Sequence, residues 1–330
     1  MSDWFGRVTL DILGVTALGC DFNSIRDPHT PLIEIYRKAL RPNRATMVMW
    51  QMAMLPPKWL TRLLPVNGPH NLWEAVDVAR QTCRDLIHRK KIQLETDETD
   101  TRSDFISLAL ESNAFTEEEL VNHTMTMLGA GHDTTAAAMT WTIYALCLHP
   151  SVQSRLREEI HRSIPSGTAD IGPNLIDSLP YLRAVINEVL RCYPTIPIIQ
   201  RAAAHDTAIL GQYIPKGTVI TAPPWAINYS RELWGADAEQ FNPERWLGYG
   251  KANGGGAENN FAFMTFSHGP RSCIGQGFAK AELSCVIAKF VGRFEFAMKD
   301  INENVTPQGP MTAKPKNGMN IRLKVVEAWN

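Results

Sequence analysis

The sequence has few cysteines, no long apolar run and almost no net charge. Its six cysteines, at positions 20, 83, 147, 192, 273 and 285, form no CxxC pair, which argues against a disulfide framework and against a cysteine-rich zinc site. Lys and Arg total 33 against 34 Asp and Glu, so no global charge attracts nucleic acid. A run of about 18 apolar residues, the length of a membrane span, does not occur.

Hydrophobic residues are present in the proportion of a globular protein, 44%, and most follow a helical period as far as residue 193. At the start, Trp4, Val8, Ile12 and Val15 recur at spacings of three and four and predict a helix. Because helical pattern begins almost with the first residue, we expect the chain to lack an earlier part of its fold.

A longer helix is predicted from the sequence TEEE at Thr116 to Glu119, which has the spacing of a capping box, up to His149 before Pro150. A second predicted helix covers about Leu182 to Cys192. Further on, glycines and prolines separate short apolar runs between residues 202 and 221, which indicates small strands, and a last strand is predicted at 320–325. The acidic run 96–100 is interpreted as a solvated linker.

One decapeptide, Phe266 to Gly275, places Cys273 near two glycines and an arginine, just before a helical pattern. A thiolate is the form of cysteine that binds iron, and a helix N-terminus stabilises its negative charge. Glycine at 269 and 275 permits close approach of a flat macrocycle. Arg271 is suited to pair with a carboxylate of that macrocycle.

Phe266, Gly269, Arg271, Cys273 and Gly275 match the FxxGxRxCxG haem-binding loop, and on these residues the chain resembles the cytochrome P-450 superfamily. The resemblance implies haem b as the cofactor, with Cys273 as the axial ligand of its iron. It also implies that the other four residues of the loop contact the haem.

The predicted long helix carries a second match, because Ala130, Gly131, Asp133 and Thr134 resemble the family's AGxDTT segment. The resemblance implies that Ala130 and Gly131 open a groove in the helix beside the haem, where a freed carbonyl and a hydroxyl hold oxygen and water. Asp133 and Thr134 would then be the catalytic residues that handle protons for cleavage of the oxygen bond.

Two further segments match the family in the expected order. Glu188 and Arg191 form its ExxR motif, at a spacing that puts both side chains on one helix face, and Arg245 stands in its PERW segment. The resemblance implies that these three form a buried structural triad. Arg201 resembles the arginine that binds a haem propionate. The predicted substrate-lining residues are apolar for the most part: Met127, Ala130, Thr195, Ile196, Ile198 and Ile199.

The expected fold is mainly α with small β-sheets, the cytochrome P-450 fold without its N-terminal helices and strands. We expect one partial domain over 1–330. Its helical part covers about 1–193, and about 194–330 holds the small sheet, the cysteine loop, and the C-terminal helix and strands.

The resemblance implies a monooxygenase that inserts one oxygen atom of O2 into a lipophilic small molecule. Its electrons would come from an NADPH-linked reductase. Two alternatives stay open: a truncated, non-catalytic relic, and a haem-thiolate isomerase or dehydratase. No nucleic acid partner is expected. A full-length family member of the microsomal type would sit at the endoplasmic reticulum membrane through an anchor upstream of this sequence, whereas the location of this chain stays open.

Overall fold

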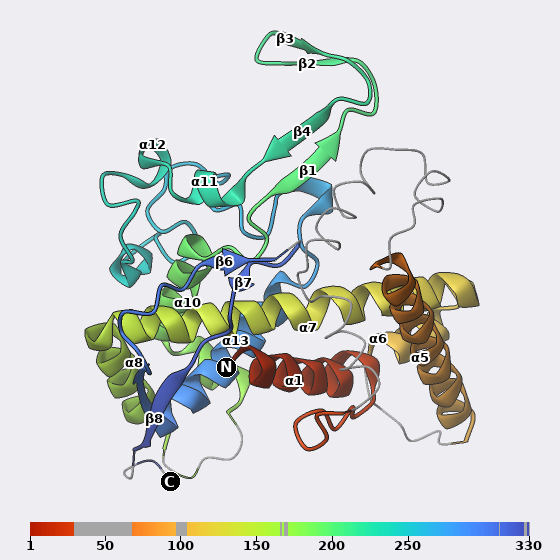
Figure 1. Ribbon diagram of the computed structural model, residues 1–330, viewed down its shortest axis with the longest axis horizontal. Helices are drawn as coiled ribbons and strands as arrows, with labels where there is room; N and C mark the ends of the chain where they lie inside the picture. The colour runs from red at the N-terminus through yellow and green to blue at the C-terminus, as the bar shows by residue number, and fades with distance from the viewer. Residues whose placement is uncertain are drawn as a thin grey trace. The chain divides into compact units, whose positions relative to one another are not determined.

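The computed structural model describes residues 1–29, 68–96, 104–165, 167, 171–309, 311–326 and 329, with side chains from residue 76 onward in the second range. The predicted linker at 96–100 lies almost entirely outside them. The described chain is mainly helical, with four two-stranded antiparallel sheets (Figure 1). Contacts divide it into a first unit, Met1–Ala137 with Val305–Gly318, and a second unit, Ala138–Asn304 with Met319–Asn330. The prediction of a single domain stays a prediction.

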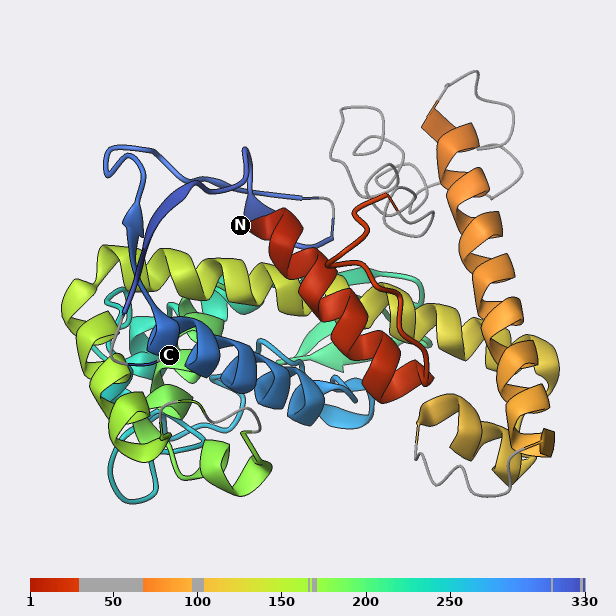
Figure 2. The same cartoon turned by 90° about the horizontal axis from the view of Figure 1, so that it is seen from below.

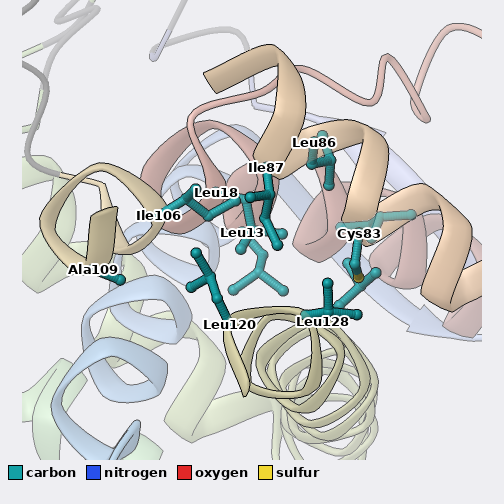
Figure 3. Close-up of a cluster of buried hydrophobic side chains, with 11 residues drawn as sticks. Leu13, Leu18, Cys83, Leu86, Ile87, Ile106, Ala109, Leu120 and Leu128 are labelled. Carbon is teal, nitrogen blue, oxygen red and sulfur yellow. The ribbon is translucent and has the colours of Figure 1, made fainter. Parts of the chain in front are cut away.

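In the first unit the elements are α1 (Ser2–Leu13), the π-helical turn η1 (Gly14–Leu18), α5 (Gly68–Thr96), α6 (Phe105–Ser112), the first part of α7 (Glu117–Leu148), and strands β6 (Pro307–Gln308) and β7 (Lys314–Pro315). Helix α5 contacts α6, and Figure 2 shows α6 beside one end of α5. Leucine and isoleucine side chains from these helices meet in one buried cluster (Figure 3). This cluster is the core that holds the first unit together.

Helix α7 begins as its sequence predicts. The Thr116 hydroxyl accepts a hydrogen bond from the amide of Glu119 at 3.3 Å, and the Glu119 carboxylate accepts one from the amide of Thr116 at 2.9 Å. These bonds satisfy amides that a helix N-terminus otherwise leaves without partners. The 32-residue helix ends before Pro150, and at 1.5 Å per residue it is about 48 Å long.

In the second unit the helices are α8 (Pro150–Ser163), α9 (Pro173–Asp177), α10 (Pro180–Cys192), α11 (Pro224–Asn228), α12 (Arg231–Trp234) and α13 (Gln276–Arg293), with short 3-10 turns η2 (Pro243–Trp246) and η3 (Gly269–Arg271). Its strands are β1 (Ile199–Ala202), β2 (Thr207–Ile209), β3 (Gln212–Ile214), β4 (Val219–Ala222), β5 (Phe294–Met298) and β8 (Ile321–Val325). Helix α10 contacts α8, α11, α13 and η2. Every residue from Tyr181 to Cys192 except Arg183 is buried, so α10 is the central helix of this unit.

Strands β1 and β4 pair antiparallel, and the shorter hairpin β2–β3 continues beyond them (Figure 1). The strands predicted between 202 and 221 and at the C-terminal end are therefore present. Among the described residues, none of the helices combines the length and the apolar character that crossing a membrane requires.

Candidate functional site

The loop around Cys273 belongs to the second unit and leads into α13. The Cys273 amide donates a hydrogen bond to the carbonyl of Phe266 at 2.9 Å, and the Ser272 amide donates one to the carbonyl of Gly269 at 3.0 Å. Gly269 has a φ of 80°, a backbone conformation that glycine adopts without strain. These bonds close the loop and set Cys273 three residues before the first residue of α13.

Cys273 is exposed, whereas Cys83, Cys147 and Cys192 are buried and Cys20 and Cys285 are partly so. Burial raises the pKa of the Cys20, Cys83, Cys147 and Cys192 thiols to about 12, and it raises the pKa of Cys285 as well. Those five thiols are therefore protonated at neutral pH and poor iron ligands. Cys273 is the exposed cysteine among the six.

Gly275 lies beside the Cys273 sulfur, because a Cβ at this position would be 3.9 Å from the Sγ atom. Arg271 is exposed at the end of η3, and Arg201 is exposed on β1, where its guanidinium donates to the carbonyl of Gln200 at 2.8 Å. Neither arginine forms a salt bridge among the described residues. Both guanidinium groups are thus available to an anionic group from outside the chain.

Glu188, Arg191 and Arg245 are brought together by α10 and η2. Arg191 donates to both carboxylate oxygens of Glu188, at 2.9 and 2.8 Å, and Arg245 donates to the same carboxylate at 3.1 Å. The side chains of Glu188 and Arg191 are completely buried, with 0% exposed. Arg191 also donates to the carbonyls of Asn228, Ala238 and Gln240 at 2.6 to 2.8 Å. Every charge in this network therefore has several partners.

Two residues of this network did not emerge from the sequence. Asp237 accepts a hydrogen bond from Arg245 at 2.9 Å and so balances the second guanidinium. Trp246 donates its indole N–H to Glu188 at 2.8 Å. Trp246 stands in the PERW segment, which was a signal for its place beside Arg245, whereas no motif marks Asp237.

The predicted oxygen-handling segment lies on α7 in the first unit. Met127, Ala130 and Thr134 are spaced by three and four residues and share one helix face, where Ala130 is exposed and the other two are half-buried. Helix α7 continues through this segment. The carbonyl of Ala130 accepts a hydrogen bond from the Thr134 hydroxyl at 2.8 Å. Alanine, as the best helix former, offsets the cost of the glycines in this segment.

Gly131 faces α1, because a Cβ on it would come within 2.9 Å of the Leu13 side chain. Its small size thus serves helix packing in the first unit. Asp133 is buried and forms an ion pair with Lys314 of β7. Lys314 was not a predicted site residue, since it is 181 positions away from Asp133 and stands in no motif.

The predicted substrate-lining residues after α10 differ in exposure. Thr195 is buried, Ile196 and Ile199 are half-buried, and Ile198 is exposed. Ile199 begins β1, where it pairs with Ala222. An exposed isoleucine on this segment is the kind of surface that contacts an apolar ligand. Their role in substrate binding stays a prediction.

A haem group needs a thiolate, room beside it for a flat ring, and cations for two propionates. The second unit offers an exposed thiol at Cys273, a glycine next to its sulfur, and the exposed guanidinium groups of Arg271 and Arg201. The residues present therefore fit the group. Cys273 would hold the iron, and the two arginines would hold the propionates.

The family model for cytochrome P450 matches residues 1–322. The chain is 43% identical over 333 residues to the cytochrome P450 monooxygenase sphH of Aspergillus fumigatus, covering 99% of this chain and 61% of that protein. It is 38% identical over 347 residues to the cytochrome P450 monooxygenase buaD of Petromyces alliaceus, covering 100% and 63%. To the cytochrome P450 monooxygenase ALT8 of Alternaria alternata it is 36% identical over 375 residues, covering 100% and 62%.

The chain thus spans about six tenths of the length of the curated relatives that it matches. Haem binding and electron transfer from a redox partner are general properties that this match implies. The substrate and the particular electron donor are not given by these names.

Proposed function

Because the chain belongs to the cytochrome P450 family, we propose that it forms the haem-binding part of a monooxygenase that inserts one oxygen atom of O2 into a lipophilic small molecule. The observation that carries the proposal is the exposed Cys273, in a hydrogen-bonded loop directly before α13. The other five cysteines are unsuited, because burial raises their pKa.

In this proposal Cys273 binds the iron, Arg271 and Arg201 bind the propionates, and Phe266, Gly269 and Gly275 lie against the ring. The resemblance also assigns Ala130 and Gly131 of α7 to haem binding, and Gly131 lies against Leu13 of α1 in the structure. The bound haem would supply dioxygen activation, to which a thiolate ligand contributes electron density. Glu188, Arg191 and Arg245 stay away from the chemistry and fix α10 and η2.

Asp133 and Thr134 have the proposed role of moving protons. A carboxylate that takes a proton from solvent and a hydroxyl that passes it on are a suitable pair for such a relay. Thr134 already has a defined orientation through its bond to Ala130. The substrate side would be lined by Met127, Ala130, Thr195, Ile196, Ile198 and Ile199, whose apolar surface suits a lipophilic molecule.

The proposed electron donor is an NADPH-linked reductase, and the proposed location of the whole protein is the endoplasmic reticulum membrane. Both rest on the type of family member that the sequence resembles. Fractionation of cells that produce the protein at its natural level would test the location. Recovery away from the reticulum would contradict it.

The activity is tested by oxygen uptake. Haem-loaded protein, with a microsomal reductase and NADPH, should consume oxygen and NADPH, and Thr134→Ala should change the share of electrons that leaves as hydrogen peroxide. A protein that binds haem but consumes neither reactant would support the isomerase or dehydratase alternative. A protein that retains no haem would support the non-catalytic relic.

A further inference from the structure

Lys280 of α13 lies over two aromatic rings of the segment that leads to Cys273. Its ammonium nitrogen is 5.6 Å from the ring centroid of Phe263 and 5.7 Å from that of Phe266. The two rings are 6.3 Å apart and meet edge to face, at an interplanar angle of 68°. A cation within about 6 Å of an aromatic ring is attracted by its π-electrons. Lys280 therefore binds both rings at once.

The positive charge of half-buried Lys280 is not neutralised by a salt bridge to an acidic side chain within the described residues. Burial lowers the pKa of Lys280, and the nearby positive charge of Arg183 lowers it further. A cation that is withdrawn from water costs free energy unless a partner offsets this cost. The rings of Phe263 and Phe266 supply an attraction that favours the ammonium form. Because the rings carry no net charge, they leave the positive charge uncompensated.

Helix α13 itself gains no stability from the charge of Lys280. The helix begins at Gln276, and the Ala279 amide donates to the carbonyl of Gly275 at 2.8 Å, so Lys280 stands just after the first turn. Positive side chains are favourable near the C-terminal end of a helix and unfavourable near its N-terminal end. The contacts of Lys280 therefore serve the neighbouring loop rather than α13.

The two rings under Lys280 belong to segments that hold the site. The carbonyl of Phe266 accepts the hydrogen bond from the Cys273 amide at 2.9 Å, so the position of Phe266 fixes one end of the loop. Phe263 packs edge to face on Trp246, with 5.4 Å between the ring centroids, and Trp246 belongs to the buried network of α10 and η2. Lys280 thus connects the loop of the proposed iron ligand to that network.

We propose that Lys280 is a positioning residue of the haem site, which holds Phe266 in place and makes the bound iron easier to reduce, an inference that rests on the proposed haem-binding function of Cys273. An uncompensated positive charge in a partly buried place favours a nearby group that gains negative charge. When a redox partner delivers one electron to the iron, the haem site gains the charge of that electron, while Lys280 keeps its proton and its contacts. Reduction is thus favoured although no proton or electron passes through Lys280.

Four variants of the haem-loaded protein test this inference. Lys280→Met and Lys280→Gln remove the charge, and Lys280→Arg keeps both the charge and the contact with the rings. Lys299→Met is the control, because it removes one positive charge from an exposed position of the same unit. A spectroscopic redox titration measures the ratio of reduced to oxidised haem at a fixed potential, without turnover. Amide hydrogen exchange of residues 263–273 in the haem-free chain measures the hold on Phe266 without the cofactor.

At the potential where half of the parent haem is reduced, the ratio of reduced to oxidised haem should be about fivefold lower in Lys280→Met and in Lys280→Gln. Lys280→Arg and Lys299→Met should stay within about twofold of the parent. Exchange of the Cys273 amide should be about threefold faster in Lys280→Met, because the loop opens more often when Phe266 is not held. A purely structural role would change the exchange but not the ratio.

An unchanged ratio in Lys280→Met, with the haem still bound through a thiolate, would overturn the proposal. A ratio that falls equally in Lys280→Arg or in Lys299→Met would also overturn it, because the effect would then not depend on a charge at this place. Unchanged exchange of the Cys273 amide in Lys280→Met would do the same. Parent protein that binds no haem would instead contradict the proposed function, and the exchange experiment would still decide whether Lys280 holds Phe266.

Discussion

The ion network around Arg191 in the second unit and the Asp133–Lys314 pair in the first unit hold charge in opposite ways. Arg191 and Glu188 are completely buried, and Arg191 alone donates to Glu188 and to three backbone carbonyls. Asp133 and Lys314 make one contact at the edge of solvent.

The two groups of charged side chains differ in burial and in the number of their hydrogen-bond partners, and this difference determines how much each contributes to stability. Each member of the buried network would leave several polar groups without partners if it shifted, because its side chain is shielded from solvent. We therefore assign a fixed structural role to Glu188, Arg191 and Arg245, and we expect the partly buried Asp133–Lys314 pair to contribute less to stability.

The largest effect is expected from Glu188→Ala, which leaves Arg191 and Arg245 without their shared carboxylate. The loss of the carboxylate that these two buried cations share should lower the free energy of unfolding by about 3–5 kcal/mol, measured by urea titration with circular dichroism. Glu239→Ala breaks only the exposed pair with Arg231 and should change it by about 0.5 kcal/mol or less. Equal effects of the two variants would contradict the comparison.

The first unit offers its own buried pair as a second comparison. Lys90 and Asp104 are each 3% exposed and lie 2.8 Å apart, and Asp104 also caps α6 at the amide of Ser107. Lys90→Met should therefore cost about 3 kcal/mol of unfolding free energy. The neighbouring variant Lys91→Met breaks only an exposed pair with Glu117 and should leave stability nearly unchanged. If Lys90→Met and Lys91→Met lower the free energy of unfolding equally, burial does not determine how much these ion pairs stabilise the protein.

A smaller loss of stability is expected at acid pH. Burial opposes the ionisation of Asp104 and Asp237, yet hydrogen bonds from Lys90 and Ser107, and from Asn242 and Arg245, outweigh it and lower both pKa values. Stability from a lowered carboxyl pKa is complete above the unfolded value of about 3.9 and is lost as the pH falls through the folded pKa. Urea titrations between pH 6 and pH 3 should show this loss, and Asp237→Asn should make it shallower. An unchanged acid slope in that variant would exclude Asp237 as a source.

The smallest effect on stability is expected from Lys314→Met. Its pair with Asp133 is single and partly exposed, so the free energy of unfolding should fall by about 1 kcal/mol or less. Urea titrations of Lys314→Met and Glu188→Ala under the same conditions compare their free energies of unfolding directly. A loss as large as that of Glu188→Ala would contradict the comparison between the two groups of charges.

Local patterns predicted the elements that carry the site. The capping box at Thr116, Pro150 between α7 and the rest of α8, and the spacing of Glu188 and Arg191 depend on neighbours within four residues, and such signals are visible in a sequence. The mainly helical class with small sheets is confirmed, because most of the helical pattern lies in strongly periodic segments.

Local sequence patterns did not predict the contacts between segments that are distant in the chain. Asp237 reaches Arg245 through a turn that no motif marks, and Lys314 reaches Asp133 from 181 residues away. The packing of Gly131 against Leu13 also joins segments that are distant in the sequence, and no local pattern marks it. Tertiary packing, rather than propensity, decides these features.

The most direct test of the account is the spectrum of the reduced, carbon monoxide-bound protein. Haem-loaded parent protein should show the Soret band of a thiolate-bound haem, Cys273→Ser should lose that band, and Cys285→Ser, a change at a half-buried cysteine of α13, should keep it. A thiolate band that survives Cys273→Ser would contradict the assignment of Cys273 as the ligand.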